Sequence, residues 1–258
     1  MLLSVKHLYK SFGGVKATND ISIEVNNHQI VSIIGPNGAG KTTFFNLISG
    51  VYKPDQGEII FNGESIAGLD LNLITHKGIA RTFQNIRLFK GLTVLENVLT
   101  SCDPSAKYGI FDALLNTPRR KRIDKENSEA CLHYLELVGL KDYIHERPEN
   151  LPYGLQRKLE LARALATHPQ LLLLDEPAAG LNPSEVRGFV DLIIKLHQDN
   201  DFAILIIEHR MAVVNELSQW IYVLNFGKML AEGTPAEIRN DPEVIKAYIG
   251  EENCDAGN

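Results

Sequence analysis

The chain has 258 residues, 44% of them hydrophobic and 22% charged, which allows one large domain or two small ones with an ample core. Its formal net charge of −6 argues against a nucleic-acid binder, which would usually carry a basic face, so we expect no nucleic-acid partner. The start of the chain lacks a signal-peptide pattern, and its apolar runs are far shorter than the about 20 residues that span a bilayer. We therefore expect a cytoplasmic protein that reaches a membrane only through a partner.

Three cysteines, Cys102, Cys131 and Cys254, are far apart and show neither metal-ligand nor redox-pair spacing. Cytoplasmic proteins keep their thiols reduced, so we expect three free thiols. We assign no chemistry to them.

In the first third of the chain, strand-like and turn-like stretches alternate. Asn62-Gly63 reads as a tight turn after the last of these strands. Apolar alternation or β-branched runs predict strands over 2–8, 21–25, 29–34 and 57–62.

The middle of the chain, from about 85 to 164, has a helical pattern instead. Ala130, Tyr134 and Val138 recur at fourfold spacing, which predicts a helix. The basic run at 119–122 is read as a solvated helix start, with contact to a partner or to lipid phosphates as the alternative.

The last third returns to an α/β pattern. Continuous apolar runs at 171–174 and 203–207 predict strands buried on both faces of a parallel sheet. Asn182-Pro183 begins a helix that we expect to reach about His197, because it combines an N-cap residue with proline at the first helical position.

A glycine-rich loop follows the predicted strand at 29–34 and precedes a helical run. Glycines there let backbone amides surround phosphate oxygens, and the helix N-terminus adds a positive dipole end. Lys41 is expected to reach the β- and γ-phosphates and the Thr42 hydroxyl to bind Mg²⁺. The P-loop pattern is complete in Gly35-Pro36-Asn37-Gly38-Ala39-Gly40-Lys41-Thr42. By itself it indicates only a nucleoside triphosphate site, as in kinases, GTPases and transport ATPases.

Two acids follow the buried strand at 171–174. Asp175 lies at the carboxyl end of this strand, where open α/β sheets bind ligands, and we expect it on the Mg²⁺ side of the site. Glu176 points elsewhere and is our candidate for the base that polarises the attacking water.

With these motifs in this order, the chain from about Leu3 to Gly250 resembles an ABC ATPase. The resemblance implies an α/β P-loop NTPase of the ABC ATPase type, with a RecA-like core, a β subdomain and an inserted helical subdomain. It places the catalytic core at 1–84 and 166–258 and the helical subdomain at 85–165. It also implies ATP and Mg²⁺ as ligands and a dimer that encloses the nucleotide.

The resemblance assigns further residues to the nucleotide. Phe12 matches the aromatic residue that stacks on adenine, with Val15 and Ala17 nearby. Gln84 matches the glutamine that contacts Mg²⁺ and the attacking water at the hinge to the helical subdomain, and His209 matches the switch histidine that bonds the γ-phosphate. The phosphate-binding set is Asn37, Gly38, Ala39, Gly40, Lys41, Thr42 and Thr43.

The signature segment departs from the Leu-Ser-Gly-Gly-Gln consensus of the family. It reads Leu151-Pro152-Tyr153-Gly154-Leu155, so only the leucine and the second glycine match. Pro152 has neither a hydroxyl nor an N–H group, whereas Gly154 and Leu155 still offer backbone amides to the γ-phosphate on the other subunit. We expect a weaker but working contact in trans.

Within the family, the resemblance is strongest to ATPases that import branched-chain amino acids. It rests on the Tyr-Gly of the signature, an insertion at about 103–124, and the segments 159–163, 176–183, 207–209, 233–235 and 247–250. It implies a second ATPase subunit, membrane-spanning permease subunits, indirectly a solute-binding protein, and a peripheral place on the cytoplasmic membrane face. A groove near Gln84, including 87–93, is expected to receive a helix of the permease.

Other functions stay open at this stage. Lipopolysaccharide export and urea import ATPases are near relatives within the family. A soluble ABC ATPase acting on DNA or ribosomes, a P-loop kinase and a non-catalytic regulatory partner belong to other classes. The chain has no sustained heptads and one P-loop, and a kinase would leave Gln84 and His209 unexplained.

Overall fold

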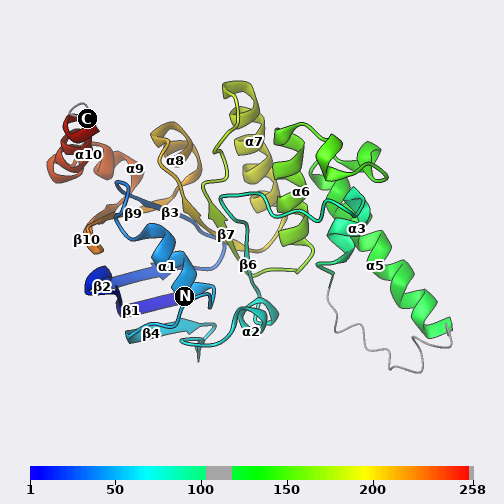
Figure 1. Ribbon diagram of the computed structural model, residues 1–258, viewed down its shortest axis with the longest axis horizontal. Coiled ribbons are helices and arrows are strands. Elements are labelled where there is room, and N and C mark those ends of the chain that lie inside the picture. Colours follow the sequence, from blue (N-terminus) through cyan, green and yellow to red (C-terminus); the bar gives the residue numbers. More distant parts are fainter. Residues whose placement is uncertain (103–117, 256–258) are drawn as a thin grey trace.

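The computed structural model describes residues 1–102 and 118–255 (Figure 1). Most of the predicted insertion at 103–124, and the side chains of the basic run at 119–121, lie outside the described part. In Figure 1 the strands gather on one side of the molecule and a group of helices forms a lobe on the other.

A six-stranded sheet in the order β10-β9-β3-β8-β7-β6 forms the centre of the molecule. Neighbouring strands from β9 to β6 are parallel, and β10 joins β9 as an antiparallel hairpin. The three central strands are entirely buried, as their uninterrupted apolar runs require. The strands are β3 (Ile30–Ile34), β6 (Ile79–Arg81), β7 (Leu171–Asp175), β8 (Ala203–Ile207), β9 (Trp220–Asn225) and β10 (Lys228–Gly233).

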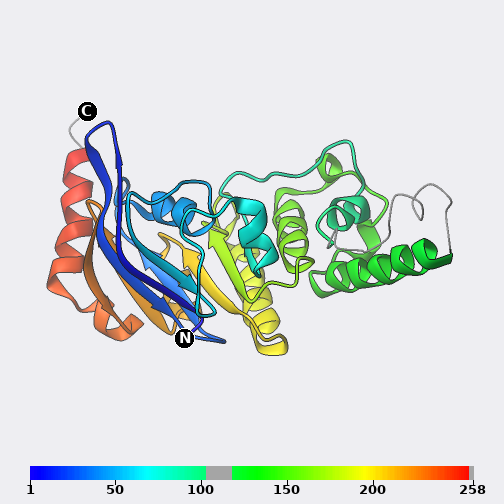
Figure 2. The same ribbon diagram turned by 90° about the horizontal axis from the view of Figure 1, so that it is seen from below.

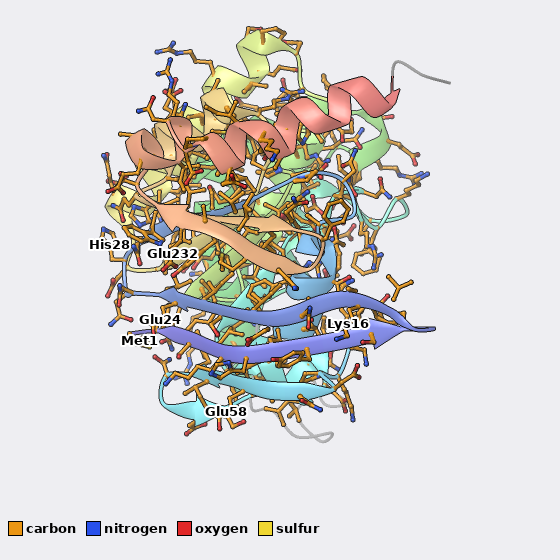
Figure 3. The ribbon with its side chains drawn as sticks, turned by 90° about the vertical axis from the view of Figure 1, so that its left-hand side faces the viewer. Met1, Lys16, Glu24, His28, Glu58 and Glu232 are labelled. Atoms are coloured by element: carbon orange, nitrogen blue, oxygen red, sulfur yellow. A yellow bond between two sulfur atoms is a disulfide. The ribbon has the colours of Figure 1, made fainter. Side chains whose placement is uncertain are left out.

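A second, antiparallel sheet in the order β2-β1-β4-β5 packs beside the first. Its strands are β1 (Leu3–Phe12), β2 (Val15–Val25), β4 (Gln56–Phe61) and β5 (Glu64–Ser65). Figure 2 shows the long β1–β2 hairpin from its edge, and Figure 3 shows Lys16 near the hairpin turn and Glu24 near its other end. The inward residues of both sheets and of α1 (Lys41–Ile48) share one apolar core.

Helices α7 (Pro183–Asp199) and α8 (Met211–Leu217) follow strands of the central sheet, and α2 (Leu71–His76) precedes β6. Helices α9 (Pro235–Arg239) and α10 (Pro242–Asp255) close the chain beside β10. Asn182 and Thr234 begin α7 and α9 with complete capping boxes, each followed by proline, as their sequence pattern predicts.

The segment between β6 and β7 forms the separate lobe of Figure 1. It contains α3 (Val94–Leu99), α5 (Pro118–Leu137), the short 3₁₀ turns η1 (Lys141–Tyr143) and η2 (Pro148–Asn150), and α6 (Tyr153–Leu165). These helices share a core with α7 and one face of the central sheet. The subdomain boundaries at 84/85 and 165/166 stay predictions.

The expectation of three free thiols is wrong for two of them. Cys102, after α3, and Cys131, in α5, form a disulfide that joins two elements of the helical lobe. Sequence spacing did not reveal the pair because 29 positions separate the two cysteines, and only the packing of α3 on α5 brings them together.

The predicted strands at 2–8, 21–25, 29–34, 57–62, 171–174 and 203–207 are all confirmed, although β1 and β2 are longer than expected. None of the helices within the described ranges is long and apolar enough to cross a membrane.

Candidate active site

The P-loop connects the carboxyl end of β3 to the first turn of α1. Gly35, Gly38 and Gly40 have φ angles of 144°, 77° and 99°, which L-residues rarely adopt. A Cβ on Gly35 would lie 2.0 Å from the carbonyl oxygen of Leu224, and a Cβ on Gly40 would lie 2.2 Å from that of Ala17. Glycine is therefore required at Gly35 and Gly40 for two reasons: the positive φ angle and the close approach of neighbouring backbone.

Lys41 is the first residue of α1 and is 7% exposed. Its ammonium group donates to the carbonyl oxygens of Gly35, at 2.6 Å, and Pro36, at 2.8 Å. The loop therefore closes around a positive charge at the N-terminus of a helix, which is the electrostatic arrangement that phosphate requires.

A cavity of about 430 Å³ opens over this loop. The structure brings together there most of the residues that the sequence assigns to the nucleotide, from four separate parts of the chain. Gln84 and Glu176 contribute from the ends of β6 and β7, and Lys16, Ala17 and Phe226 are additional members. The lining residues are Val15, Lys16, Ala17, Asn37, Gly38, Ala39, Gly40, Lys41, Thr42, Thr43, Gln84, Glu176 and Phe226.

Glu176 is held in a fixed position at this cavity. Its backbone has φ 47°, and its N–H donates to the carbonyl oxygen of Ile207 at 2.9 Å. The Gln84 amide Nε2 donates to Glu176 Oε2 at 2.7 Å. A positive φ in a non-glycine residue is a strained conformation that recurs at functional sites.

His209 completes this group. Its Nδ1 lies 4.0 Å from Glu176 Oε2 and 3.8 Å from Glu208 Oε2, and its side chain is half exposed. Glu208 is fully buried, and its carboxylate accepts the backbone N–H groups of His209 and Arg210, at 2.8 and 3.0 Å. Glu208 thus fixes the backbone from which His209 projects, a role that the sequence analysis missed.

Asp175 forms a buried ion pair that the sequence analysis also missed. Arg81, at the end of β6, donates from Nη2 to Asp175 Oδ2 at 2.8 Å, and both side chains are about 5% exposed. Burial raises the pKa of the Asp175 carboxyl, and the hydrogen bond and charge of Arg81 oppose that rise. Arg81 could have been found only from the pairing of β6 with β7, since 94 positions separate the two residues.

The predicted metal ligands suit Mg²⁺. Thr42, Gln84 and Asp175 offer a hydroxyl, an amide oxygen and a carboxylate, which are the hard oxygen donors that this ion takes. Among the described residues, no group of three or more His, Cys, Asp or Glu side chains could hold a metal by itself.

The signature segment lies apart from this cavity. Gly154 and Leu155 instead line a cavity of about 260 Å³ with residues of α7 and of the loop before it. The ring of Tyr153 packs on Gly180, where an added Cβ would lie 2.8 Å from the ring. Arg157 then ties α6 to the loop after β6, donating to the Gln84 carbonyl and to the Tyr153 hydroxyl.

Phe12 is also placed away from the lining of the P-loop cavity. Its ring packs edge-on against Tyr52 with centroids 5.2 Å apart, and the ammonium of Lys10 lies 5.5 Å from the ring centroid. The stacking of Phe12 on adenine stays a prediction.

Comparison with known proteins shows the family. The ABC transporter family profile matches residues 18–179, and the profile described as branched-chain amino acid ATP-binding cassette transporter matches 228–253. The high-affinity branched-chain amino acid transport ATP-binding protein LivG of Salmonella typhimurium is 47% identical over 97% of this chain and 98% of its own length. Its Pseudomonas aeruginosa counterpart BraF is 46% identical over the same shares of the two chains.

Solved structures agree with this relationship. An ATP-binding cassette of an ABC transporter in its ADP conformation superposes with a TM-score of 0.84 and 32% identity, covering 96% of this chain and 98% of the other. A dimeric bacterial ABC transporter cassette superposes with a TM-score of 0.75 and 25% identity, covering 91% and 99%. The chain belongs to the ABC transporter family and is one of its ATP-binding, ATP-hydrolysing subunits.

Proposed function

We propose that the cavity over the P-loop is where this chain hydrolyses ATP. The observation that carries the proposal is the Gln84–Glu176 pair, which faces the P-loop and its lysine within one cavity. Lys41 and the loop amides would hold the phosphates, and Thr42, Gln84 and Asp175 would hold Mg²⁺. The bound ion would neutralise negative charge on the phosphate oxygens.

Glu176 acts on the attacking water. Its carboxylate accepts a water proton while the Gln84 amide keeps the carboxylate oriented, so that the water oxygen attacks the γ-phosphorus in line with the leaving oxygen. Lys41 and the loop amides stabilise the charge on the transferring phosphoryl group because they are already aligned before the reaction. His209 bonds the γ-phosphate from the side of Glu176 and senses its loss.

A second chain completes the site. Gly154 and Leu155 do not line the P-loop cavity of their own chain, yet α6 begins at Tyr153, so both lie in the first turn of a helix. The Leu155 N–H donates to the Pro152 carbonyl at 3.0 Å, so Gly154 is the residue of the two whose amide would face the phosphate. A head-to-tail pair would bring each segment to the other chain's γ-phosphate, and the structural likeness to a dimeric cassette supports such a pair. ATP then links the two chains, and hydrolysis releases them.

A groove between the helical lobe and the core elements α2 and β6 would receive the permease, so that the chain sits peripherally on the membrane. It has a volume of about 470 Å³ and is lined on one side by Arg87, Leu88 and Phe89. Phe89 is 50% exposed, and the Arg163 guanidinium lies 4.9 Å from its ring centroid. An amphipathic helix with an apolar anchor and an acidic group fits this surface.

The transported solutes would be branched-chain or other hydrophobic amino acids. The high identity to LivG and BraF over nearly the whole chain supports this choice. A lipopolysaccharide export ATP-binding protein, LptB of Haemophilus influenzae, is 32% identical over 97% of this chain, so export is the second candidate.

Two measurements test the proposal. Phosphate release by the full chain should require Mg²⁺ and should be abolished in Glu176→Gln. Leucine uptake into vesicles that carry the chain with its permease subunits should require ATP and fail with the same variant. Turnover that Glu176→Gln leaves intact would overturn the catalytic role, and ATPase activity without leucine uptake would overturn the choice of solute.

A further inference from the structure

The turn between β9 and β10 presents a large aromatic side chain to solvent beside the P-loop cavity. Phe226 is 84% exposed and lies in the left-handed region with φ 45°. Both properties carry a free-energy cost, because apolar surface stays in water and a bulky residue rarely adopts this φ. Neither property helps the chain to fold.

Another hairpin of the same protein shows which residue suits this backbone. Asn62 and Gly63, between β4 and β5, have φ 50° and 78°, and Phe226 and Gly227 have φ 45° and 74°. Both pairs are two-residue hairpin loops. Asn-Gly is favoured in such turns because asparagine tolerates a positive φ. Phe226 therefore occupies a position that asparagine would fill at lower cost.

The turn is fixed against the P-loop by its backbone. The Gly227 N–H donates to the Ala39 carbonyl at 3.0 Å, and the Gly227 carbonyl accepts the Asn19 N–H at 2.7 Å. A Cβ on Gly227 would lie 2.9 Å from the carbonyl oxygen of Ala17. These contacts hold the ring of Phe226 at the wall of the cavity rather than on a freely moving loop.

The sheet order places Phe226 and Glu176 on opposite sides of the phosphate loop. The P-loop follows β3, Phe226 follows the neighbouring strand β9, and Glu176 follows β7 on the other side of β3. With the γ-phosphate directed toward Glu176, the rest of the nucleotide extends toward β9. Val15 and Ala17 line the cavity with Phe226.

We propose that the Phe226 ring packs on the base of bound ATP and ADP and contributes to nucleotide affinity. The inference rests on the proposed phosphate site and adds a base contact made by the β9–β10 turn. An aromatic ring gives a base a flat apolar surface, and such stacking strengthens binding in a sequence-tolerant way. The cost of exposing Phe226 is then offset when nucleotide covers it.

The test compares a ligand that has a base with one that has only phosphates. Affinities of the full chain for ADP and for inorganic tripolyphosphate, each with Mg²⁺, are measured by calorimetry in wild type, Phe226→Asn and Phe226→Tyr. We expect ADP to bind Phe226→Asn at least about fivefold more weakly, since a stacked base is lost. Tripolyphosphate affinity should not change, and Phe226→Tyr should bind ADP like wild type. The melting temperature of Phe226→Asn should equal or exceed that of wild type, because asparagine suits the turn.

Tyr143→Asn is the matched control, because Tyr143 is an exposed aromatic residue in η1 of the helical lobe, and it should leave both affinities unchanged. Unchanged ADP affinity in Phe226→Asn would overturn the proposal. So would equal weakening of ADP and tripolyphosphate, which would mean that the turn acts through the P-loop. A defect only in ATP-driven dimerisation would place Phe226 against a second copy and overturn it as well. If wild type binds ADP but not tripolyphosphate, the phosphate assignment fails, while the ADP comparison still decides Phe226.

Discussion

The P-loop cavity and the signature segment differ in how much of a site one chain assembles. At the cavity, residues from β2, the P-loop, β6, β7 and the β9–β10 turn converge on one space, and Gln84 already bonds Glu176. The signature segment packs within its own chain through Tyr153 on Gly180 and Arg157 on the loop after β6. The fold brings the first region together within one chain, whereas we propose that the second meets its ligand on another subunit.

The altered signature retains the helix start on which the proposed contact in trans depends. Pro152 is the N-cap of α6 and its carbonyl accepts the Leu155 N–H at 3.0 Å, while Tyr153 packs on a neighbouring loop, so Gly154 keeps its place in the first turn of the helix. What the segment offers a γ-phosphate is the start of a helix, and this persists without the serine hydroxyl. Four predictions test this difference between the P-loop cavity and the signature segment.

The largest effect is expected from Glu176→Gln. Losing a positioned base typically lowers turnover by about 10² to 10⁴-fold, while the P-loop and therefore ATP affinity stay intact. Phosphate release and equilibrium ATP binding measure the two effects, and light scattering should show an ATP-stabilised dimer. An equal loss of ATP affinity would show that the carboxylate belongs to the binding region and not only to the chemistry.

Arg81→Ala should destabilise the fold of the cavity edge. Removing one partner of a buried ion pair costs about 3–5 kcal/mol, because the other charge stays buried alone. Without Arg81 the pKa of Asp175, already raised by burial, rises further. A protonated, neutral Asp175 carries no penalty for a buried charge. The loss in the free energy of unfolding caused by Arg81→Ala should therefore be smaller at pH 5 than at pH 8. Urea unfolding at both pH values measures it, and a deficit that grows toward low pH would contradict the assignment.

Lys41→Ala should strongly weaken ATP binding. The loss of charge-assisted hydrogen bonds to phosphate corresponds to about 10- to 150-fold in affinity, from roughly 1.5–3 kcal/mol. Calorimetry with ATP measures this, and Lys246→Ala, at an exposed position of α10, serves as a control that keeps the P-loop intact. Normal ATP affinity in Lys41→Ala would show that the P-loop does not bind the nucleotide.

Gly154→Ala should have the smallest effect, and only in trans. The new Cβ would lie 2.9 Å from a carboxylate oxygen of Glu185, and the capping box of α7 holds this carboxylate in place, so the first turn of α6 has to give way. ATP binding by the monomer should be unchanged, while ATP-driven dimerisation and turnover fall several-fold because the first turn of α6 is shifted, on the order of 1 kcal/mol. Light scattering at several protein concentrations separates dimerisation from ATP binding by the monomer. Weaker ATP binding by the monomer would show that the signature segment belongs to the site of its own chain.

Local sequence was enough to predict the residues that contact the phosphates and the attacking water. The P-loop, Asp175 and Glu176 were predictable because each joins a strand to a turn within a few residues, and strand ends, glycines and capping residues mark such junctions. Gln84 and His209 could be assigned by resemblance, and the structure places both beside Glu176. The β9–β10 hairpin was missed, although two apolar strands separated by a residue pair ending in glycine would have indicated it.

By itself, the sequence determined the α/β class, the phosphate loop, the paired acids and the family, because periodicity and short motifs are properties of neighbouring residues. Only the tertiary structure decided that Arg81 pairs with Asp175, that Cys102 bonds Cys131, and that Phe226 reaches the P-loop cavity. These contacts depend on the order of strands in the sheet and on the packing of α3 against α5. Residues far apart in the chain meet there, and no local pattern records which strands become neighbours.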